Sequence, residues 1–236
     1  MFYSILLTLI YSQSILNELR YVVLDSSKYP IKSTKQLSKH YKEVKNLFPG
    51  FNATFSLTKA SKLDHFMILH KNQLVAFLVV DKLKGLINKK TTVDVFGYFL
   101  VCVTPKYQNM GLSKKLMKFS VDYYKKNHKD GYLALHISPK DESMALAAKV
   151  YYQMGFTKFT WCKYSFRDYL NNLDFYFDNF IDFYQTFEKK DSKIKGGYLC
   201  SFIKITDFLS KKIKAPKNSL KEGERIKKLM TERLIN

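Results

Sequence analysis

Short apolar runs bounded by turn residues recur along most of the chain and predict β-strands. Two of these runs are separated by the turn Lys71-Asn72, which predicts a hairpin. A lysine-rich stretch between two other runs, residues 83–90, is predicted to be a loop. The predicted strands are residues 19–24, 66–70, 74–80, 93–103, 132–138, 156–166 and 198–205.

Other segments repeat their apolar residues at the spacing of an α-helix. Residues 31–48 have an apolar face and a lysine-lined face, which is typical of a solvated helix surface, and Pro49-Gly50 ends them. Residues 167–190 carry aromatic side chains at spacings of 4, 3, 4 and 3, which predicts one long aromatic helix. The two other predicted helices begin at Leu112 and at a cap formed by Asp141 or Ser143, and the second of them ends before Gly155.

The resulting order, β-α-β-β-β-α-β-α-β, predicts an α/β fold with a mixed central sheet and helices on both faces. The aromatic helix is an insertion before the last strand, and a basic tail follows that strand. The predicted divisions are an apolar extension (1–16), a core (17–166), the helical insertion (167–197), the last strand (198–205) and the tail (206–236).

The composition says more about the possible binding partners than about the fold. A formal net charge of +20 favours anionic partners such as phosphate-bearing ligands, nucleic acid or an anionic membrane surface, and disfavours strongly basic substrates. Three cysteines without paired spacing argue against a disulfide framework, for a reducing compartment and against a zinc site. No apolar run reaches the roughly 18 residues that span a bilayer. Residues 2–11 are apolar but short, so they predict an extra strand or a packed segment, with a signal peptide as the alternative.

The segment with the clearest chemistry is residues 101–124, VCVTPKYQNMGLSKKLMKFSVDYY. A predicted strand ends at Val103, a turn follows at Pro105, and a small-residue loop leads into the helix that begins at Leu112. The first N–H groups of a helix lack intrahelical partners, and the helix dipole adds positive charge there. Gly111 would let a ligand approach the backbone closely. The segment is therefore a candidate site for phosphate or pyrophosphate.

This loop resembles the phosphate loop of the GNAT superfamily of acyl-CoA-dependent N-acetyltransferases, whose pattern is Gln/Arg-x-x-Gly-x-Gly/Ala. Gln108 and Gly111 match it, and Ser113 replaces the last small residue. Residues 147–156, AAKVYYQMGF, are similar to the second GNAT signature, with Tyr151 four residues before Gly155. The Asn often found earlier in that helix is replaced by Met144. The resemblance covers roughly residues 17–166 and one later strand.

The resemblance implies an acetyl-CoA site in which backbone N–H groups of the loop surround the pyrophosphate and the central strand pairs with the pantetheine arm. One N–H near Val101 or Val103 would polarise the thioester carbonyl. The implied cofactor-binding residues are Val101, Val103, Gln108, Asn109, Met110, Gly111, Leu112, Ser113 and Lys114.

The resemblance also implies a general acid for the departing thiolate, and Tyr151 stands at that position. Packing among the 17 tyrosines, with Tyr152 facing inward instead, is the alternative. Some relatives carry a Glu on the central strand as the base, but that position here is Gly97. Asp94 and His136 are the candidate bases, although either residue could be structural. A base acting through water, or an amine with a lowered pKa, would require neither.

The resemblance therefore predicts an N-acetyltransferase that moves an acetyl group from acetyl-CoA to a primary amine, of a small molecule or a protein, by direct attack in a ternary complex. The expected compartment is the cytoplasm or the nucleus, with no metal. The aromatic insertion could cover the acceptor pocket, form a homodimer interface or pack on its own core. Two alternatives stay open: an inactive GNAT-like binding module, and a basic nucleic-acid-binding protein, which the even spread of lysines does not favour.

Overall fold

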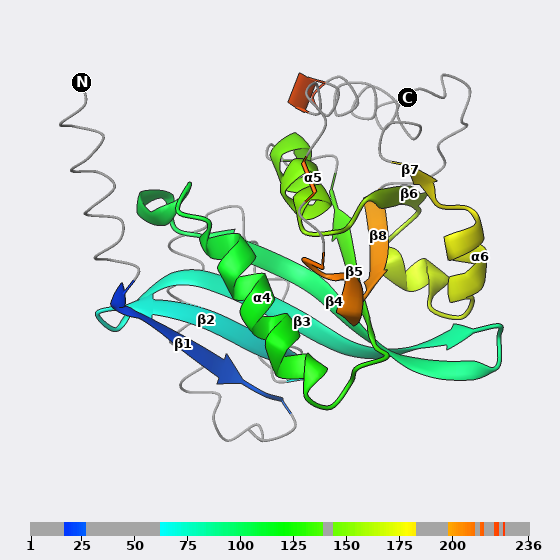
Figure 1. Cartoon of the computed structure of the whole chain (residues 1–236), viewed down its shortest axis with the longest axis horizontal. Coiled ribbons are helices and arrows are strands. Elements are labelled where there is room, and N and C mark those ends of the chain that lie inside the picture. Colours follow the sequence, from blue (N-terminus) through cyan, green and yellow to red (C-terminus); the bar gives the residue numbers. More distant parts are fainter. Residues whose placement is uncertain are drawn as a thin grey trace. The chain divides into compact units, whose positions relative to one another are not determined.

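The computed structural model describes residues 17–26, 62–138, 144–182, 198–210, 213–214, 220–221 and 224. The predictions for residues 1–16, for the helix at 31–48 and for most of the tail therefore lie outside the described residues. Within the described residues the chain forms a mixed sheet in the order β1-β2-β3-β4-β5-β8-β6-β7 (Figure 1). Its strands are β1 (Leu19–Leu24), β2 (Asp64–His70), β3 (Gln73–Ile87), β4 (Thr91–Val103), β5 (Tyr132–Ile137), β6 (Lys158–Cys162), β7 (Ile181–Asp182) and β8 (Tyr198–Lys204).

The α-helices among these residues are α4 (Leu112–Lys125), α5 (Met144–Gln153) and α6 (Leu173–Asp178). The chain divides into two compact units, which are described separately. The first unit comprises residues 1–81 and 99–123, and the second comprises residues 82–98 and 124–236. The long strands β3 and β4 contribute residues to both units.

In the first unit, α4 packs through aromatic rings against one face of the strands. The Phe66 ring of β2 makes edge contacts with Phe119 and Tyr123 of α4, at centroid distances of 5.7 and 5.6 Å. Tyr21 of β1 contacts Phe119 as well. Because successive strand residues point to opposite faces, the neighbours of Phe66 form a separate cluster on the other face. That cluster contains Leu63, Met67, Leu69, Leu74, Phe77 and Val79.

The predicted hairpin in this unit is confirmed. Strands β2 and β3 are antiparallel and are joined by Lys71 and Asn72, whose φ angles are 48° and 65°. Two successive residues with positive φ are typical of the tight turn that matches the twist of a two-stranded ribbon. Asn tolerates this conformation better than most residues, which explains its place in the turn.

In the second unit, β8 lies between β5 and β6 although it follows both in the sequence (Figure 1). It is antiparallel to β5 through Tyr132↔Lys204 to Ile137↔Leu199. It is also antiparallel to β6 through Thr160↔Cys200 to Cys162↔Tyr198. The segments predicted as strands at 156–166 and 198–205 are therefore neighbours in the sheet, with a β6 that is shorter than predicted.

Helices cover both faces of the sheet in this unit. Tyr124, near the end of α4, stacks on Phe96 of β4 with ring centroids 3.9 Å apart. The next residue of β4, Gly97, faces the other side, where the ring of Phe166 lies. The chain therefore has the α/β, GNAT-like architecture that its sequence predicts, with a mixed sheet between helical layers.

The prediction of a loop at residues 83–90 was wrong. Strand β3 continues to Ile87 and β4 begins at Thr91, so the two strands form a long hairpin. Lys82 and Lys84 are exposed, whereas Leu83 and Ile87 pack against the buried cluster of the second unit. The alternation of a half-buried strand was present, but the exposed lysines gave the segment a loop-like composition.

The single aromatic helix predicted at residues 167–190 was also wrong in its described part. A 3₁₀ turn, Phe166–Tyr169, precedes the short helix α6, and β7 follows. Ser165 and Asp168 form a capping box at the 3₁₀ turn, and the Asn172 side chain caps the start of α6. Asn179 ends α6 by donating backbone and side-chain N–H groups to the carbonyl of Phe175. These polar caps interrupt the helix at positions where aromatic periodicity alone predicts continuity.

The argument against a disulfide was wrong as well. Cys162 of β6 and Cys200 of β8 form a disulfide, with Cα atoms 6.1 Å apart, and both residues are buried. The register pairs Cys162 with Tyr198, so the two cysteines are diagonal neighbours on adjacent strands. A sequence separation of 38 residues concealed this pairing. Cys102 is not part of this disulfide.

A close contact in the second unit requires glycine at position 97. A Cβ atom at Gly97 would lie 2.1 Å from Cζ of Phe166. Phe166 is fully buried among Val95, Ala134 and Phe202, so its ring has little room to move. A side chain at position 97 and the ring at position 166 are therefore mutually exclusive.

We expect Gly97→Ala to lower the free energy of unfolding by about 1–3 kcal/mol, because of overpacking against Phe166. Phe166→Ala alone should cost about 3–5 kcal/mol. The double variant should lose clearly less than the sum, because the smaller residue at position 166 makes room for the new methyl group. Urea denaturation of the three variants measures this coupling.

Gly111→Ala is the matched control, because a Cβ there meets no atom within 4 Å. It should cost about 1 kcal/mol through backbone strain alone and should be additive with Phe166→Ala. Additive losses for Gly97→Ala and Phe166→Ala would contradict the assigned contact.

Candidate active site

The loop after β4 is held in place from both ends. At its start, the Thr104 N–H donates to the carbonyl of Val75, 2.9 Å away. A 3₁₀ turn, Pro105–Tyr107, follows, and the buried Tyr107 hydroxyl lies 2.8 Å from Nδ1 of His70. The Gln108 side chain then donates to the carbonyl of Val103, 3.2 Å away. These contacts fix the route of the chain from β4 to α4.

The backbone at the tip of the loop has a conformation that favours glycine. Gly111 has a φ of +70°, and the space that its Cβ would occupy is empty to 4 Å. Asn109 also has a positive φ, of 64°. The backbone at Gly111 is therefore accessible to a ligand, and the requirement for glycine comes from conformation as well as from open space.

Helix α4 begins directly after this tip. Its first hydrogen bond runs from the Lys115 N–H to the carbonyl of Gly111, at 3.1 Å. The preceding N–H groups of Leu112, Ser113 and Lys114 have no carbonyl one turn earlier to which they could donate. The first turn of α4 has no acidic residue to offset its positive end. The arrangement can bind an anion through backbone N–H groups, with the exposed Lys114 beside it.

The strand residues predicted to pair with a ligand are half-buried and precede this loop on β4. The parallel pairing of β4 with β5 covers only Val95↔Tyr132 to Tyr98↔Leu135. Val101 and Val103 therefore lie on the part of β4 beyond this pairing. All of the predicted cofactor-binding residues, 101, 103 and 108–114, belong to the first unit.

His136 lies on β5 in the second unit, between two aromatic rings. Its imidazole is 5.4 Å from the ring of Phe166 and 5.3 Å from that of Tyr198. Burial, with a smaller effect of the Arg167 charge, lowers the pKa of His136 from 6.5 to about 4. The imidazole is therefore neutral at pH 7 and accepts a proton only weakly.

Tyr151 is placed by the end of α5. The Phe156 N–H donates to the carbonyl of Tyr151 and the Gly155 N–H to that of Tyr152, both at 3.1 Å, while Gly155 has a φ of +113°. This is a Schellman motif, and its usual apolar contact is the ring pair Tyr151–Phe156, 6.1 Å apart. The Tyr-x-x-x-Gly-Phe spacing therefore has a structural reason as well as the suggested catalytic one. Both Tyr151 and Tyr152 are half-buried.

Asp94 is engaged elsewhere in the second unit. Its carboxylate accepts hydrogen bonds from Lys84 at 2.5 Å and from Nδ1 of His128 at 2.8 Å. Burial raises the pKa of Asp94, but the hydrogen bonds and charges of Lys84 and His128 outweigh it and leave this pKa below its ordinary value. Asp94 shares the face of β4 with Phe96, whereas His136 contacts Phe166 on the opposite face. The structure does not bring Asp94 and His136 together.

Sequence reasoning missed the residues that surround His136. Phe166, Arg167 and Tyr198 come from segments far from β5 in the sequence and meet it only through the sheet order. A signal was present at Ser165-x-x-Asp168, whose capping-box spacing marks the turn that positions Phe166.

Among the described residues, no group of His, Cys, Asp and Glu side chains could hold a metal ion. In the same part of the chain, no helix is long and apolar enough to cross a membrane.

The lowered pKa of His136 predicts a pH dependence of stability. The unfolded chain, with a His pKa near 6.5, takes up the proton first, so the free energy of unfolding should fall between about pH 6.5 and about pH 4. The imidazole contribution to this loss should be up to about 3 kcal/mol. Urea unfolding across this range should show a smaller loss in His136→Phe than in the unmodified chain.

Tyr198→Phe serves as the control, because it keeps the neighbouring ring and the imidazole and should retain the loss. Equal pH dependence in His136→Phe and the unmodified chain would show that the imidazole is not shielded from water as described.

The family described as "Putative acetyl-transferase" matches this chain over residues 29–230. No curated protein matches it. Solved structures that resemble it include an aminoglycoside acetyltransferase from an uncultured soil metagenomic sample in complex with trehalose, at 17% identity and a TM-score of 0.44, covering 57% of this chain and 86% of that one.

Two others are similar over more of the chain. The ribosomal-protein-S18-alanine N-acetyltransferase of Escherichia coli is 13% identical, with a TM-score of 0.42, and covers 78% of this chain and 90% of that one. A GNAT family acetyltransferase of Elizabethkingia anophelis, with acetyl-CoA bound, is 13% identical, with a TM-score of 0.45. The match covers 79% of this chain and 98% of that one. Because the family match extends over most of the length of this chain, the chain belongs to the family described as "Putative acetyl-transferase".

Proposed function

We propose that this acetyltransferase is an N-acetyltransferase that moves an acetyl group from acetyl-CoA to a primary amine by direct attack in a ternary complex. The observation that carries the proposal is the loop between β4 and α4. Its accessible Gly111 backbone, the free N–H groups at the start of α4 and the absence of acid in the first turn of that helix suit a pyrophosphate.

In this proposal the loop residues 108–114 hold the pyrophosphate of acetyl-CoA, mainly through backbone N–H groups, and Lys114 adds a point charge. Val101 and Val103 pair with the pantetheine arm through their backbones. The carbonyl of Val103 already accepts the Gln108 side chain, so Gln108 orients the strand end. One N–H near Val101 or Val103 stabilises the oxyanion that forms when the amine attacks the thioester carbonyl.

We propose Tyr151 as the acid that donates a proton to the departing thiolate. A phenol is protonated at neutral pH and can donate in the transition state. The end of α5 supports this role because the Tyr151 carbonyl accepts two hydrogen bonds, from the Met154 N–H at 2.9 Å and from the Phe156 N–H at 3.1 Å. Tyr152 shares the helix end but lies on a different side of it, which makes it a matched control.

For proton removal from the amine, we favour His136 over Asp94. Asp94 is held by Lys84 and His128 and has a lowered pKa, whereas His136 is neutral at pH 7. A pKa of about 4 makes the imidazole a weak base, so it suits passing the proton on to water rather than keeping it. An amine that arrives neutral would need no base.

Calorimetry tests the cofactor site. Acetyl-CoA should bind saturably at about 150–300 mM salt, where the general attraction of a +20 chain for anions is screened. Gly111→Glu should abolish binding, because it adds bulk and negative charge beside the helix start. Gly111→Ala, which adds only strain, should weaken binding by less than about tenfold. ATP serves as the charge control.

Binding of ATP as tight as that of acetyl-CoA, or binding unaffected by Gly111→Glu, would refute the proposed cofactor site. Steeply salt-dependent binding of DNA or RNA would instead support the alternative of a basic nucleic-acid-binding protein.

Turnover with a panel of primary amines tests the chemistry. Tyr151→Phe should lower kcat by about 10²-fold, the size of a typical general-acid contribution, while Tyr152→Phe should leave kcat nearly unchanged. His136→Gln should lower kcat by a smaller factor if the imidazole relays the proton. A chain that binds acetyl-CoA but transfers acetyl to no amine would be an inactive GNAT-like module.

A further inference from the structure

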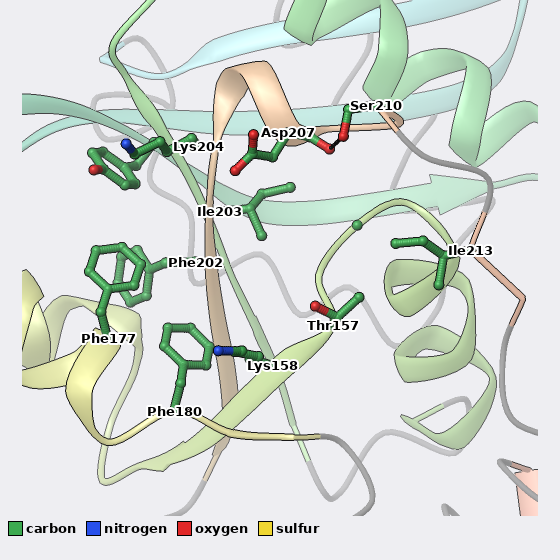
Figure 2. A pocket seen from close by; sticks show the side chains of 12 residues that line it. Thr157, Lys158, Phe177, Phe180, Phe202, Ile203, Lys204, Asp207, Ser210 and Ile213 are labelled. Carbon is green, nitrogen blue, oxygen red and sulfur yellow. Dashed lines mark hydrogen bonds between the residues drawn. The ribbon is translucent and has the colours of Figure 1, made fainter.

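A pocket of about 510 Å³ lies in the second unit, where β6 and β8 separate. The paired register of these strands ends at Thr160↔Cys200, and the hydrogen bond from Ser201 Oγ to the Lys158 carbonyl, at 2.6 Å, lies just past it. Beyond this bond β8 continues to Lys204. Strands and a connecting loop supply one part of the lining, and the segments around the end of α6 and after β8 supply the rest (Figure 2). The lining residues are Tyr132, Gly155, Thr157, Lys158, Phe177, Phe180, Phe202, Ile203, Lys204, Asp207, Ser210 and Ile213.

One side of the pocket is aromatic. Phe177 and Phe180 have nearly parallel rings, with centroids 5.7 Å apart and planes 19° apart. Phe177 also contacts Tyr132, the first residue of β5, at 5.5 Å. Figure 2 shows Phe177, Phe180 and Phe202 around the same opening. Rings in this arrangement can enclose a flat apolar body.

The other side carries two ammonium groups on one face of the sheet. Lys204 is directly opposite Tyr132 in the register. Lys158 precedes Thr160 by two residues, so it faces the same way as Thr160 and its partner Cys200. Both lysines are exposed, and within the described part of the chain neither forms an ion pair.

The pocket has one acidic residue. Asp207 Oδ1 accepts a hydrogen bond from Thr206 Oγ1 at 3.4 Å, and the Ser210 hydroxyl donates to the Asp207 backbone carbonyl at 2.9 Å. Asp130 and Asp174 also act electrostatically on Tyr132, and the backbone register places Asp182 opposite Lys158. Among the residues that line the pocket, two lysines and one aspartate leave a net positive charge beside the aromatic wall. This combination complements an anion attached to an apolar ring.

The pocket does not include the imidazole proposed above as a base. It adjoins Tyr132 at the start of β5, whereas His136 stands four residues further along the strand, roughly 13 Å away. We propose that this pocket is a second ligand site, which binds a small aromatic carboxylate through its ring and its anionic group together. Inorganic phosphate would gain nothing from the phenylalanines, and a polypeptide would need a larger surface than this volume provides.

Fluorescence titration with naphthalene-2-carboxylate at about 150 mM salt tests the proposal, because screening suppresses general attraction to the basic chain. Naphthalene-2-methanol, with the same ring and no charge, should bind at least about tenfold more weakly. Lys158→Met/Lys204→Met should weaken carboxylate binding by at least about tenfold, the effect of losing charge-assisted hydrogen bonds. Phe180→Ala should weaken both probes.

Lys126→Met/Lys129→Met is the matched control, because it removes the same charge outside the pocket and should change the affinity by less than about twofold. Circular dichroism and thermal unfolding confirm that each variant is folded. Acetyl-CoA should not displace the naphthalene probe, which separates this site from the proposed transfer site.

Four results would each overturn the proposal. They are equal affinity for the carboxylate and the alcohol, an equal loss in the control variant, displacement by acetyl-CoA, and no saturable binding of the carboxylate to the folded chain.

Discussion

The arrangement of the second unit depends on the contact between the Phe166 ring and the bare backbone of Gly97. The ring fills the space that any side chain at position 97 would need, and it also touches His136 and Phe202 on the neighbouring strands. One buried ring thereby joins β4, β5 and β8 to the turn that precedes α6. A carboxylate side chain at position 97 of β4 is incompatible with this packing.

Because position 97 carries no side chain, any acid or base must come from other parts of the chain. The face of β4 that contains Gly97 is apolar. The His136 imidazole of β5, which lies on the same side of the sheet, is kept neutral by burial, which lowers its pKa. The charged residues near β4 lie on the opposite face, where Asp94 binds Lys84 and His128. In the proposed mechanism, this arrangement suits an amine that reaches the thioester without its proton, and the proposed anchoring of the CoA moiety by the β4–α4 loop would contribute most of what the described residues can offer to catalysis.

The sequence predicted those features that depend on local chemistry. The Lys71-Asn72 hairpin, the loop into α4 and the end of α5 at Gly155 each depend on a turn conformation that a few adjacent residues determine. Features that depend on distant pairing were missed. The Cys162–Cys200 disulfide and the aromatic surroundings of His136 exist because β8 lies between β5 and β6, and no local pattern records this insertion.

The lysines of β3 misled the prediction for a different reason, because a half-exposed strand of alternating lysine and leucine has the composition of a loop. The capping side chains around α6 likewise outweighed an aromatic period that predicted a longer helix. In both segments, the positions of individual polar residues determined the secondary structure, which the overall composition or periodicity predicted wrongly.

The position of β8 has a consequence for the order of events during synthesis. Strands β5 and β6 emerge from the ribosome before β8, yet each pairs with β8 in the finished sheet. Until residues 198–204 are made, β5 and β6 each keep a strand edge that has no partner in this sheet, and such edges promote wrong pairing. The second unit therefore completes its sheet only after residues 198–204 have been made, and its nascent form before that point is the state in which protection by a chaperone would matter most.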